Sequence, residues 1–194
     1  GVLVGGAEYV SFTDITTNVA VTAKKGSAPY PWSYVGGFAG TVKNADFLRC
    51  VNNGTVTTDG DYVSGFAAKS ETTTYTSCVN NGAITGRTKI GGFGGAVKST
   101  KTVDSYNTGT IGLAAYNGGN QGIGGLFGEM GYGSTLTRCY NTGAVTGDCY
   151  VGGLVGSVGS GSDAANGPSY IVDSYNSGSI TGHSDKNYCG IGGL

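Results

Sequence analysis

The chain has 194 residues, 39 of them glycine, and a formal net charge of −1 at pH 7. Such a near-neutral balance gives no electrostatic reason to expect nucleic acid or an anionic membrane surface as a partner. No apolar run approaches the ~20 residues that a membrane-spanning helix needs, and each glycine disfavours a helix interior by about 1 kcal/mol. We therefore expect no nucleic-acid partner, no membrane span and little helix.

Two short patterns recur along the chain. The first reads Cys/Ser-x-Asn-x-Gly and begins, after a degenerate copy at Ile15, at Cys50, Cys78, Ser105, Cys139 and Ser174. The second places Gly-Gly or Ser-Gly before Phe or Leu and begins at Val35, Val63, Ile90, Ile123, Val151 and Ile191. Successive copies of the first pattern are 27 to 35 residues apart. A repeat of that length buries its apolar face by stacking on its neighbours.

Within each copy, small or apolar residues alternate with polar ones, as they do around Cys139 and Val145. A period of two predicts short β-strands, and each repeat has room for two or three strands of ~5 residues. Stacked repeats would place equivalent strands ~4.8 Å apart in parallel sheets. The sequence therefore predicts an all-β fold. We expect a parallel β-helix (β-solenoid) of about six coils of roughly 27–35 residues, one domain over residues 1–194.

Equivalent positions in successive copies should form columns along the stack. One column carries amides that can hydrogen-bond from coil to coil: Asn52, Asn80, Asn107, Asn141 and Asn176. A second carries glycines, which indicate either a positive φ or a place with no room for Cβ: Gly54, Gly82, Gly109, Gly143 and Gly178. Two apolar columns should face the core: Val56, Ile84, Ile111, Val145 and Ile180, and Phe38, Phe66, Phe93, Leu126, Leu154 and Leu194.

The five cysteines fall into two groups. Cys50, Cys78 and Cys139 share a column with two serines, so we interpret them as small buried residues. Cys149 and Cys189 each lie two residues before the second pattern, on adjacent coils, which predicts Cα atoms ~5 Å apart. An extracellular setting would permit a disulfide there, and free thiols remain the alternative. Other copies carry Ser, Asp, Thr or Gln at this position, so we expect it to be exposed.

Gly153-Leu-Val-Gly156 and Gly125-Leu-Phe-Gly128 carry a Gly-Leu-x-Gly signature, and two further copies have Phe in place of Leu. Together with the upstream Tyr-Asn-x-Gly stretches, these residues resemble the GLUG motif family. The resemblance implies a bacterial surface or secreted protein of the adhesin-like kind. It implies no catalytic residues. The copy Gly65-Phe-Ala-Ala68 departs from the signature at its last glycine, which leaves the turn geometry of that coil open.

Residues for catalysis or metal binding are sparse. His183 is the single histidine, in a polar loop, and no Cys-x-x-Cys pair occurs, so we expect no metal and no cofactor. Asp104, Arg138 and Asp173 share a column, which fits an exposed ion ladder better than a catalytic carboxylate pair. Asp59-Gly-Asp61 matches no calcium-loop pattern.

Two outward columns could bind a ligand. Tyr106, Tyr140 and Tyr175 form an aromatic ladder that could hold sugar rings, although stacked tyrosines also stabilise parallel sheets. Thr57, Thr85, Thr146 and Thr181, with small neighbours, form a flat face that could bind ice, interrupted at Gly112.

The leading interpretation is a non-catalytic, extracellular or bacterial cell-surface β-solenoid that acts as a structural stalk, an adhesive module or a filament subunit. Its partners would be neighbouring repeats, copies of itself end to end, or a host glycan or protein ligand. Val4-Gly-Gly and Ile191-Gly-Gly fall at the same phase of the repeat, which predicts a segment of a longer chain or a self-stacking subunit. An ice-binding protein and a polysaccharide-acting β-helix enzyme are the alternatives.

Overall fold

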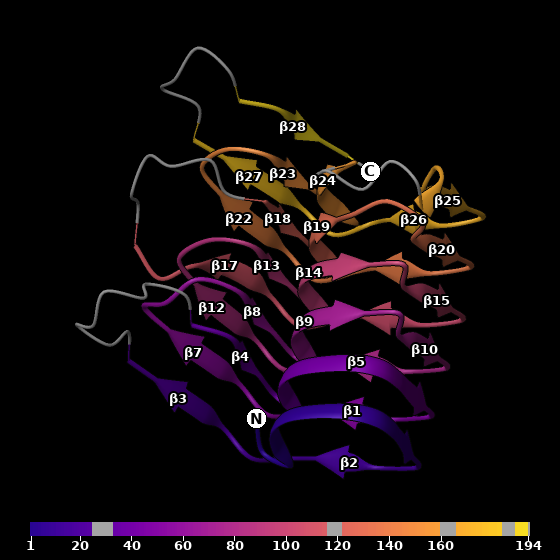
Figure 1. Ribbon diagram of the computed structural model, residues 1–194. Helices are drawn as coiled ribbons and strands as arrows, with labels where there is room; N and C mark the ends of the chain where they lie inside the picture. The colour runs from indigo at the N-terminus through magenta and orange to yellow at the C-terminus, as the bar shows by residue number, and fades with distance from the viewer. Residues whose placement is uncertain (25–32, 116–121, 160–165, 184–188, 194) are drawn as a thin grey trace.

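The computed structural model describes residues 1–24, 33–115, 122–159, 166–183 and 189–193. Over these residues the chain winds through stacked coils of short strands that rise from β1–β3 to β27 and β28 (Figure 1). Every strand pairing joins parallel strands of neighbouring coils, for example β11 with β6 and β16. The predicted parallel β-helix is confirmed.

Four sheets run along the stack, which we name A to D in the order in which each coil visits them. Sheet A has ten strands and two arms that share β1 (Val4–Thr13) and β5 (Ala39–Leu48). Its first arm continues with β9 (Ala67–Glu71), β14 (Gly94–Lys98), β19 (Phe127–Met130) and β24 (Val155–Val158). Its second arm continues with β10 (Thr74–Thr76), β15 (Lys101–Val103), β20 (Thr135–Thr137) and β25 (Tyr170–Val172).

Each of the other sheets has six strands. Sheet B contains β2 (Thr16–Thr17), β6 (Val51–Asn52), β11 (Val79–Asn80), β16 (Tyr106–Asn107), β21 (Tyr140–Asn141) and β26 (Tyr175–Asn176). Sheet C contains β3 (Val21–Ala23), β7 (Val56–Thr58), β12 (Ile84–Gly86), β17 (Ile111–Leu113), β22 (Val145–Gly147) and β27 (Ile180–Gly182). Sheet D contains β4 (Val35–Gly36), β8 (Val63–Ser64), β13 (Ile90–Gly91), β18 (Ile123–Gly124), β23 (Val151–Gly152) and β28 (Ile191–Gly192).

The strands are shorter and more numerous than predicted, because each coil turns at several fixed corners. Between the second arm of sheet A and sheet B, every coil passes through one residue with φ between 49° and 56°: Asp14, Arg49, Ser77, Asp104, Arg138 and Asp173. A positive φ at a residue with a side chain ends the extended backbone there. The coil therefore holds four or five strands, most of two or three residues, instead of two or three longer ones.

The glycine column marks a close approach between coils. A Cβ built on Gly82 would lie 2.0 Å from the carbonyl oxygen of Gly54, and one on Gly109 would lie 2.1 Å from that of Gly82. None of these glycines has a positive φ. Glycine therefore occupies this column because there is no room for a Cβ, and not because the backbone needs a positive φ.

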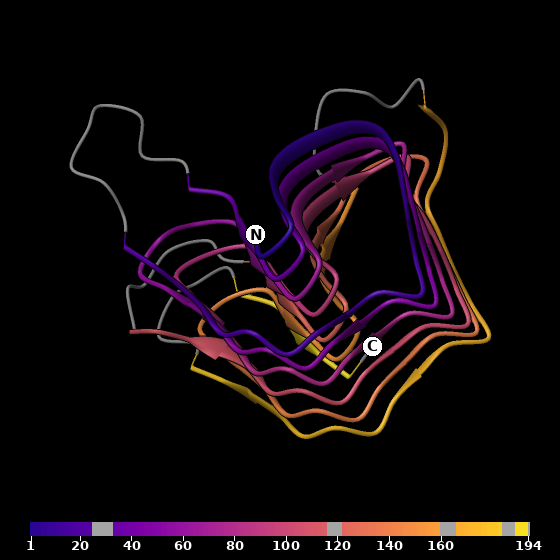
Figure 2. The same ribbon diagram turned by 90° about the horizontal axis from the view of Figure 1, so that it is seen from below.

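The interior is divided into two apolar cores, and the outline seen along the stack has two lobes with a notch between them (Figure 2). The core between sheets A and B contains the phenylalanines, with the Phe38 and Phe66 rings stacked at 4.7 Å. The core between sheets C and D contains the Val and Ile column. The five described members of the predicted Phe/Leu column are fully buried, and Leu194 lies outside the described residues.

The structure corrects one sequence expectation about a single repeat and answers the open question about another. Val4 pairs with Ala39, and the amide of Val2 donates to the Gly37 carbonyl oxygen at 2.8 Å, so Val4-Gly-Gly is not the equivalent of Val35-Gly-Gly. Ala68 does not change the turn of its coil. It is completely buried, and β9 keeps its register with β5 and β14.

Candidate functional site

The five predicted asparagines form one continuous ladder through the interior. Each Nδ2 donates to the Oδ1 of the next coil, from Asn52 to Asn176, at distances of 2.6 to 2.8 Å. Each also donates to the carbonyl oxygen two residues later, for example Asn52 to Gly54 at 2.9 Å. The Thr17 hydroxyl donates to Asn52 Oδ1 at 2.9 Å and ends the ladder. The ladder satisfies buried amides, so its role is structural.

The Cys50, Cys78 and Cys139 side chains are completely buried beside the phenylalanine core. The Sγ atoms donate to backbone carbonyl oxygens, for example Cys139 to Thr137 at 3.3 Å. Burial raises the pKa of the Cys139 thiol. The Cys139 thiol therefore fills space and is a poor nucleophile, because the reactive form is the thiolate.

A disulfide joins Cys149 and Cys189 on adjacent coils, with their Cα atoms 4.7 Å apart. The expectation that this column is exposed is wrong, because Cys149 is only 3% exposed and Asp61, its equivalent three coils earlier, is 1% exposed. The column faces the packed turn between sheets C and D. A cysteine pair or a hydrogen-bonded polar residue fits there.

Asp61 is neutralised by an arginine. Its Oδ1 accepts hydrogen bonds from the Arg87 guanidinium and from the Thr88 hydroxyl, the latter at 3.0 Å. The Asp61 amide donates to the Ser33 hydroxyl at 2.9 Å. Across the described residues no cluster of three or more His, Cys, Asp or Glu side chains is placed to hold a metal ion.

The column of Asp104, Arg138 and Asp173 is an exposed ion ladder. Arg138 Nε and Nη2 donate to the two carboxylate oxygens of Asp104 at 2.6 and 2.9 Å. Arg49 binds Asp14 in the same way on the first two coils. The hydrogen bond from Arg138 holds the pKa of Asp104 below its ordinary value. A carboxylate held by an arginine is unsuited to act as a general acid.

The predicted outward columns keep their register. Thr57 pairs with Thr85 and Thr146 with Thr181, and Thr22 adds a further rung that the sequence interpretation did not include. The Tyr106 and Tyr140 rings stack at 4.6 Å with an interplanar angle of 4°, and Tyr175 follows at 5.2 Å. The tyrosine faces therefore cover one another, which leaves mainly ring edges for a ligand. His183 borders a separate hollow of about 300 Å³ beside Asp148.

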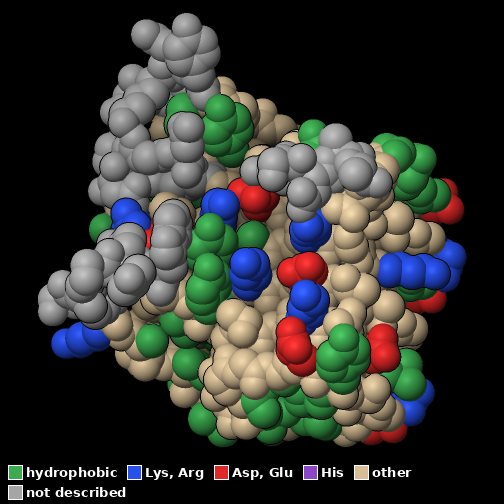
Figure 3. Space-filling model, in the orientation of Figure 1, with side chains coloured by type: hydrophobic (Ala, Val, Ile, Leu, Met, Phe, Trp, Pro, Cys, Tyr) green, Lys and Arg blue, Asp and Glu red, His purple; other side chains and the backbone are tan. Residues whose placement is uncertain are grey.

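A groove that the sequence interpretation missed runs along the outside of the stack. We call it the axial groove. Its floor is the outer face of β1, β5, β9, β14 and β19, and its opposite wall consists of Tyr34, Tyr62 and Lys89, just before strands of sheet D. Two hollows of about 430 and 310 Å³ meet at Lys69 and Glu71, which line both. Figure 3 shows Lys and Asp/Glu side chains alternating beside hydrophobic ones on this face.

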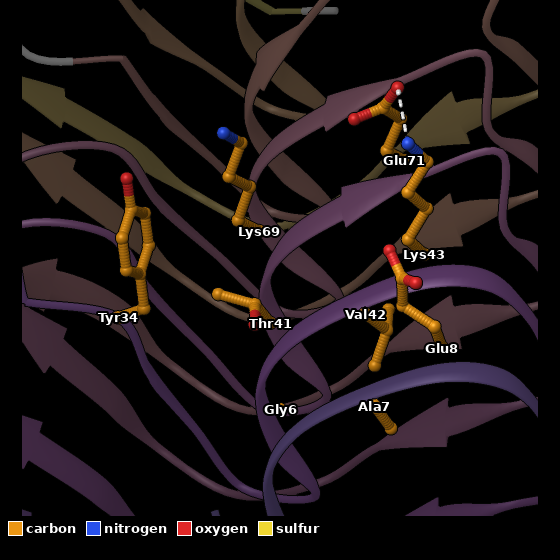
Figure 4. Close-up of a pocket in the computed structure, with 9 residues that line it drawn as sticks. All are labelled: Gly6, Ala7, Glu8, Tyr34, Thr41, Val42, Lys43, Lys69 and Glu71. Carbon is orange, nitrogen blue, oxygen red and sulfur yellow. Dashed lines mark ion pairs between the residues drawn. The ribbon is translucent and has the colours of Figure 1, made fainter.

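The far side of the floor carries a ladder of alternating charge. Glu8 pairs in register with Lys43, Lys43 with Glu71, and Glu71 with Lys98. The Lys43 ammonium lies 3.9 Å from the Glu71 carboxylate (Figure 4). Successive members are 35, 28 and 27 residues apart, the same spacing as the repeats. That spacing could have identified the ladder from the sequence.

The near side of the groove combines aromatic rings with lysines. The Tyr34 and Tyr62 rings lie 4.8 Å apart. The Lys89 ammonium sits 4.9 Å from the Tyr62 ring and 2.6 Å from a Glu129 carboxylate oxygen, an ion pair across the groove. The Lys69 ammonium lies 5.9 Å from the Tyr34 ring and points from the floor toward that wall (Figure 4). Aromatic rings with a few converging polar groups are typical of a small-molecule binding site.

No helix among the described residues has the length and apolar character needed to cross a membrane. A comparison of the chain with protein-family models found no match. Comparisons with curated proteins and with solved structures also found no significant similarity. The resemblance to the GLUG motif family therefore stays a prediction.

Proposed function

We propose that the chain is a non-catalytic β-solenoid that acts as a rigid stalk or adhesive module at a bacterial cell surface. The observation that supports this best is the continuity of the interior. The asparagine ladder and both apolar cores run through successive coils without a break. Rigid, regular stacking of this kind suits a protein that spans a distance or presents a long surface.

The acidic side chains offer little support for an enzyme. Asp104, Asp61 and Glu129 are each held by an arginine or a lysine. A glycoside hydrolase needs one carboxylic acid and one carboxylate that flank the same bond. In the described part of the chain, the groove carboxylates Glu8 and Glu71 lie in register with lysines instead.

Two features support an extracellular location and stacking partners. The Cys149–Cys189 disulfide fits an oxidising compartment. Tyr170, Val172 and Tyr175 on the last coil are 43 to 55% exposed, so a further coil, from this chain or from another copy, would cover them. The resemblance to GLUG repeats points to the same setting.

A turnover assay combined with microscopy tests the proposal. Incubation of the chain with a panel of plant, bacterial and animal polysaccharides should release no reducing ends. Negative-stain electron microscopy should show short straight rods that lengthen by end-to-end contact as the concentration rises. Release of reducing ends that is lost in the Glu129→Gln variant would establish an enzyme and overturn the proposal.

An ice-binding face is the second candidate, because threonine occupies five of the six rungs of one outward column on sheet C. It is tested by thermal hysteresis, as described in the Discussion.

A further inference from the structure

We propose that the axial groove binds a sparsely charged acidic polysaccharide, one in which uronic acids alternate with neutral sugars. A carboxylate of the ligand would accept a hydrogen bond from Lys69, and a sugar ring would lie beside Tyr34. The inference rests on the adhesive form of the proposed function. It names the ligand class and the residues that recognise it.

The shape of the groove fits an extended chain. The floor column nearest the wall runs from Gly6 through Thr41, Lys69 and Ala96 to Glu129, one residue from each of five successive coils. At ~4.8 Å per coil this column is about 19 Å long, the length of roughly four sugar units. The Lys89–Glu129 ion pair crosses the groove at one end.

Two lysines of the groove are held in ion pairs, and Lys69 is not. Lys43 pairs with Glu71 and Lys89 with Glu129. Lys69 forms no ion pair with any described residue, and its neighbours in register, Thr41 and Ala96, are uncharged. The ammonium is exposed and borders both hollows. One unpaired cation between the two hollows predicts a ligand with one anionic group at that point.

The surroundings of Lys69 distinguish between anionic ligands. Glu8, Glu71 and Glu129 line the same groove, so a polymer with several negative charges on each sugar would be repelled along its length. The half-buried Tyr34 ring offers an apolar surface to the C–H groups of a pyranose, and its hydroxyl offers a donor and an acceptor. A chain with one carboxylate per disaccharide satisfies both conditions.

Isothermal titration calorimetry with three hexasaccharides tests the assignment. The first is a hyaluronan hexasaccharide, with one carboxylate per disaccharide. The second is the same compound with its carboxylates reduced to alcohols, and the third is a heparin hexasaccharide, which is densely sulfated. We expect the first to bind the intact chain about tenfold more tightly than either of the others.

Variants locate the binding. Lys69→Met should weaken hyaluronan hexasaccharide binding about tenfold and leave binding of the reduced compound unchanged, because only the former offers a carboxylate. Tyr34→Ala should weaken both compounds equally, and Tyr34→Phe should retain most of the affinity. Lys101→Met, on the exposed second arm of sheet A, is the matched control and should bind as the unmodified chain does.

The outcomes separate this inference from the proposed function. Absence of hyaluronan binding, equal binding by Lys69→Met, or tighter binding of heparin would overturn the groove assignment. Tighter binding of a glutamate-rich hexapeptide with the same dependence on Lys69 would assign the groove to a peptide and also overturn it. None of these results bears on whether the chain forms rigid rods without turnover, which the earlier assays measure.

Discussion

The side-chain amide of Asn80 donates to Asn107 Oδ1 on the next coil at 2.6 Å. It also donates to the Gly82 carbonyl oxygen within its own coil at 2.9 Å. Both protons of this one buried group are thus used. A Cβ built on Gly65 would lie only 2.1 Å from Asn80 Oδ1, so this glycine has no room for a side chain. The ladder therefore lies at the contact between sheet B and the Gly-Gly turn.

Removing one rung should destabilise the whole stack. We expect Asn107→Leu to lower the free energy of unfolding by about 3 kcal/mol, because it removes the acceptor of one buried Asn80 amide proton and the donor to Asn141 Oδ1. Urea unfolding followed by circular dichroism measures the change. The control is Thr108→Ala on the exposed neighbouring position, for which we expect a change within about 0.5 kcal/mol. Equal losses in the two variants would contradict the structural role of the ladder.

The two kinds of glycine should respond differently to a side chain. Gly82→Ala places a Cβ against the Gly54 carbonyl oxygen at 2.0 Å and should destabilise the chain by about 3 kcal/mol or more. Gly112→Ala, whose Cβ would meet nothing closer than 3.9 Å, should be neutral or stabilising. Thermal unfolding of both variants provides the comparison. A stable Gly82→Ala protein would show that the coils can move apart there.

The Cys149–Cys189 bond should hold the last coil onto the stack. The cross-link has a sequence separation of 40 residues, and its removal should cost about 3–4 kcal/mol. Hydrogen exchange should then accelerate mainly in β25, β26 and β27, while the inner coils keep their protection. Mass spectrometry of the non-reduced protein should recover the joined peptide pair. Free thiols at both positions in protein prepared under oxidising conditions would disprove the bond.

Asp104 should titrate below its ordinary pKa. The hydrogen bond and the charge of Arg138 favour the carboxylate, so the folded-state pKa lies below the ordinary value of an aspartate. The stabilisation is present above the unfolded pKa and is lost as the pH falls through the folded one. Carboxyl NMR titration should show the pKa rise toward its ordinary value in Arg138→Gln. Asp14, which is held by Arg49, serves as an internal reference and should not change.

The threonine face should not bind ice. Among the described residues, only the coil that contains β7 has two outward threonines two positions apart, Thr55 and Thr57, and Gly112 interrupts the column. We therefore expect no thermal hysteresis from the unmodified chain. A freezing gap that disappears in Thr85→Tyr and in Thr146→Tyr would instead make ice binding the function.

Much of the architecture was predictable because it repeats. The equivalence of Cys50, Cys78 and Cys139, and the inward direction of Val56 and its counterparts, follow from spacing alone. The number of strands per coil did not follow, because corners at residues such as Arg49 and Ser77 have no common chemical type. The burial of Cys149 was also missed, since Ser, Asp and Thr in its column suggested an exposed position.

By itself, the sequence determined the parallel stack, its register and the asparagine ladder, because a residue type that recurs at the repeat spacing must lie beside its own copies. Only the tertiary structure decided which outer surfaces meet. The axial groove joins the outer face of sheet A to tyrosines that precede sheet D, and the coil must fold back on itself to bring them together. The direction in which each coil folds back depends on the positive-φ corners and on the close contacts of glycines with neighbouring coils. Neither can be read from the sequence of a single repeat.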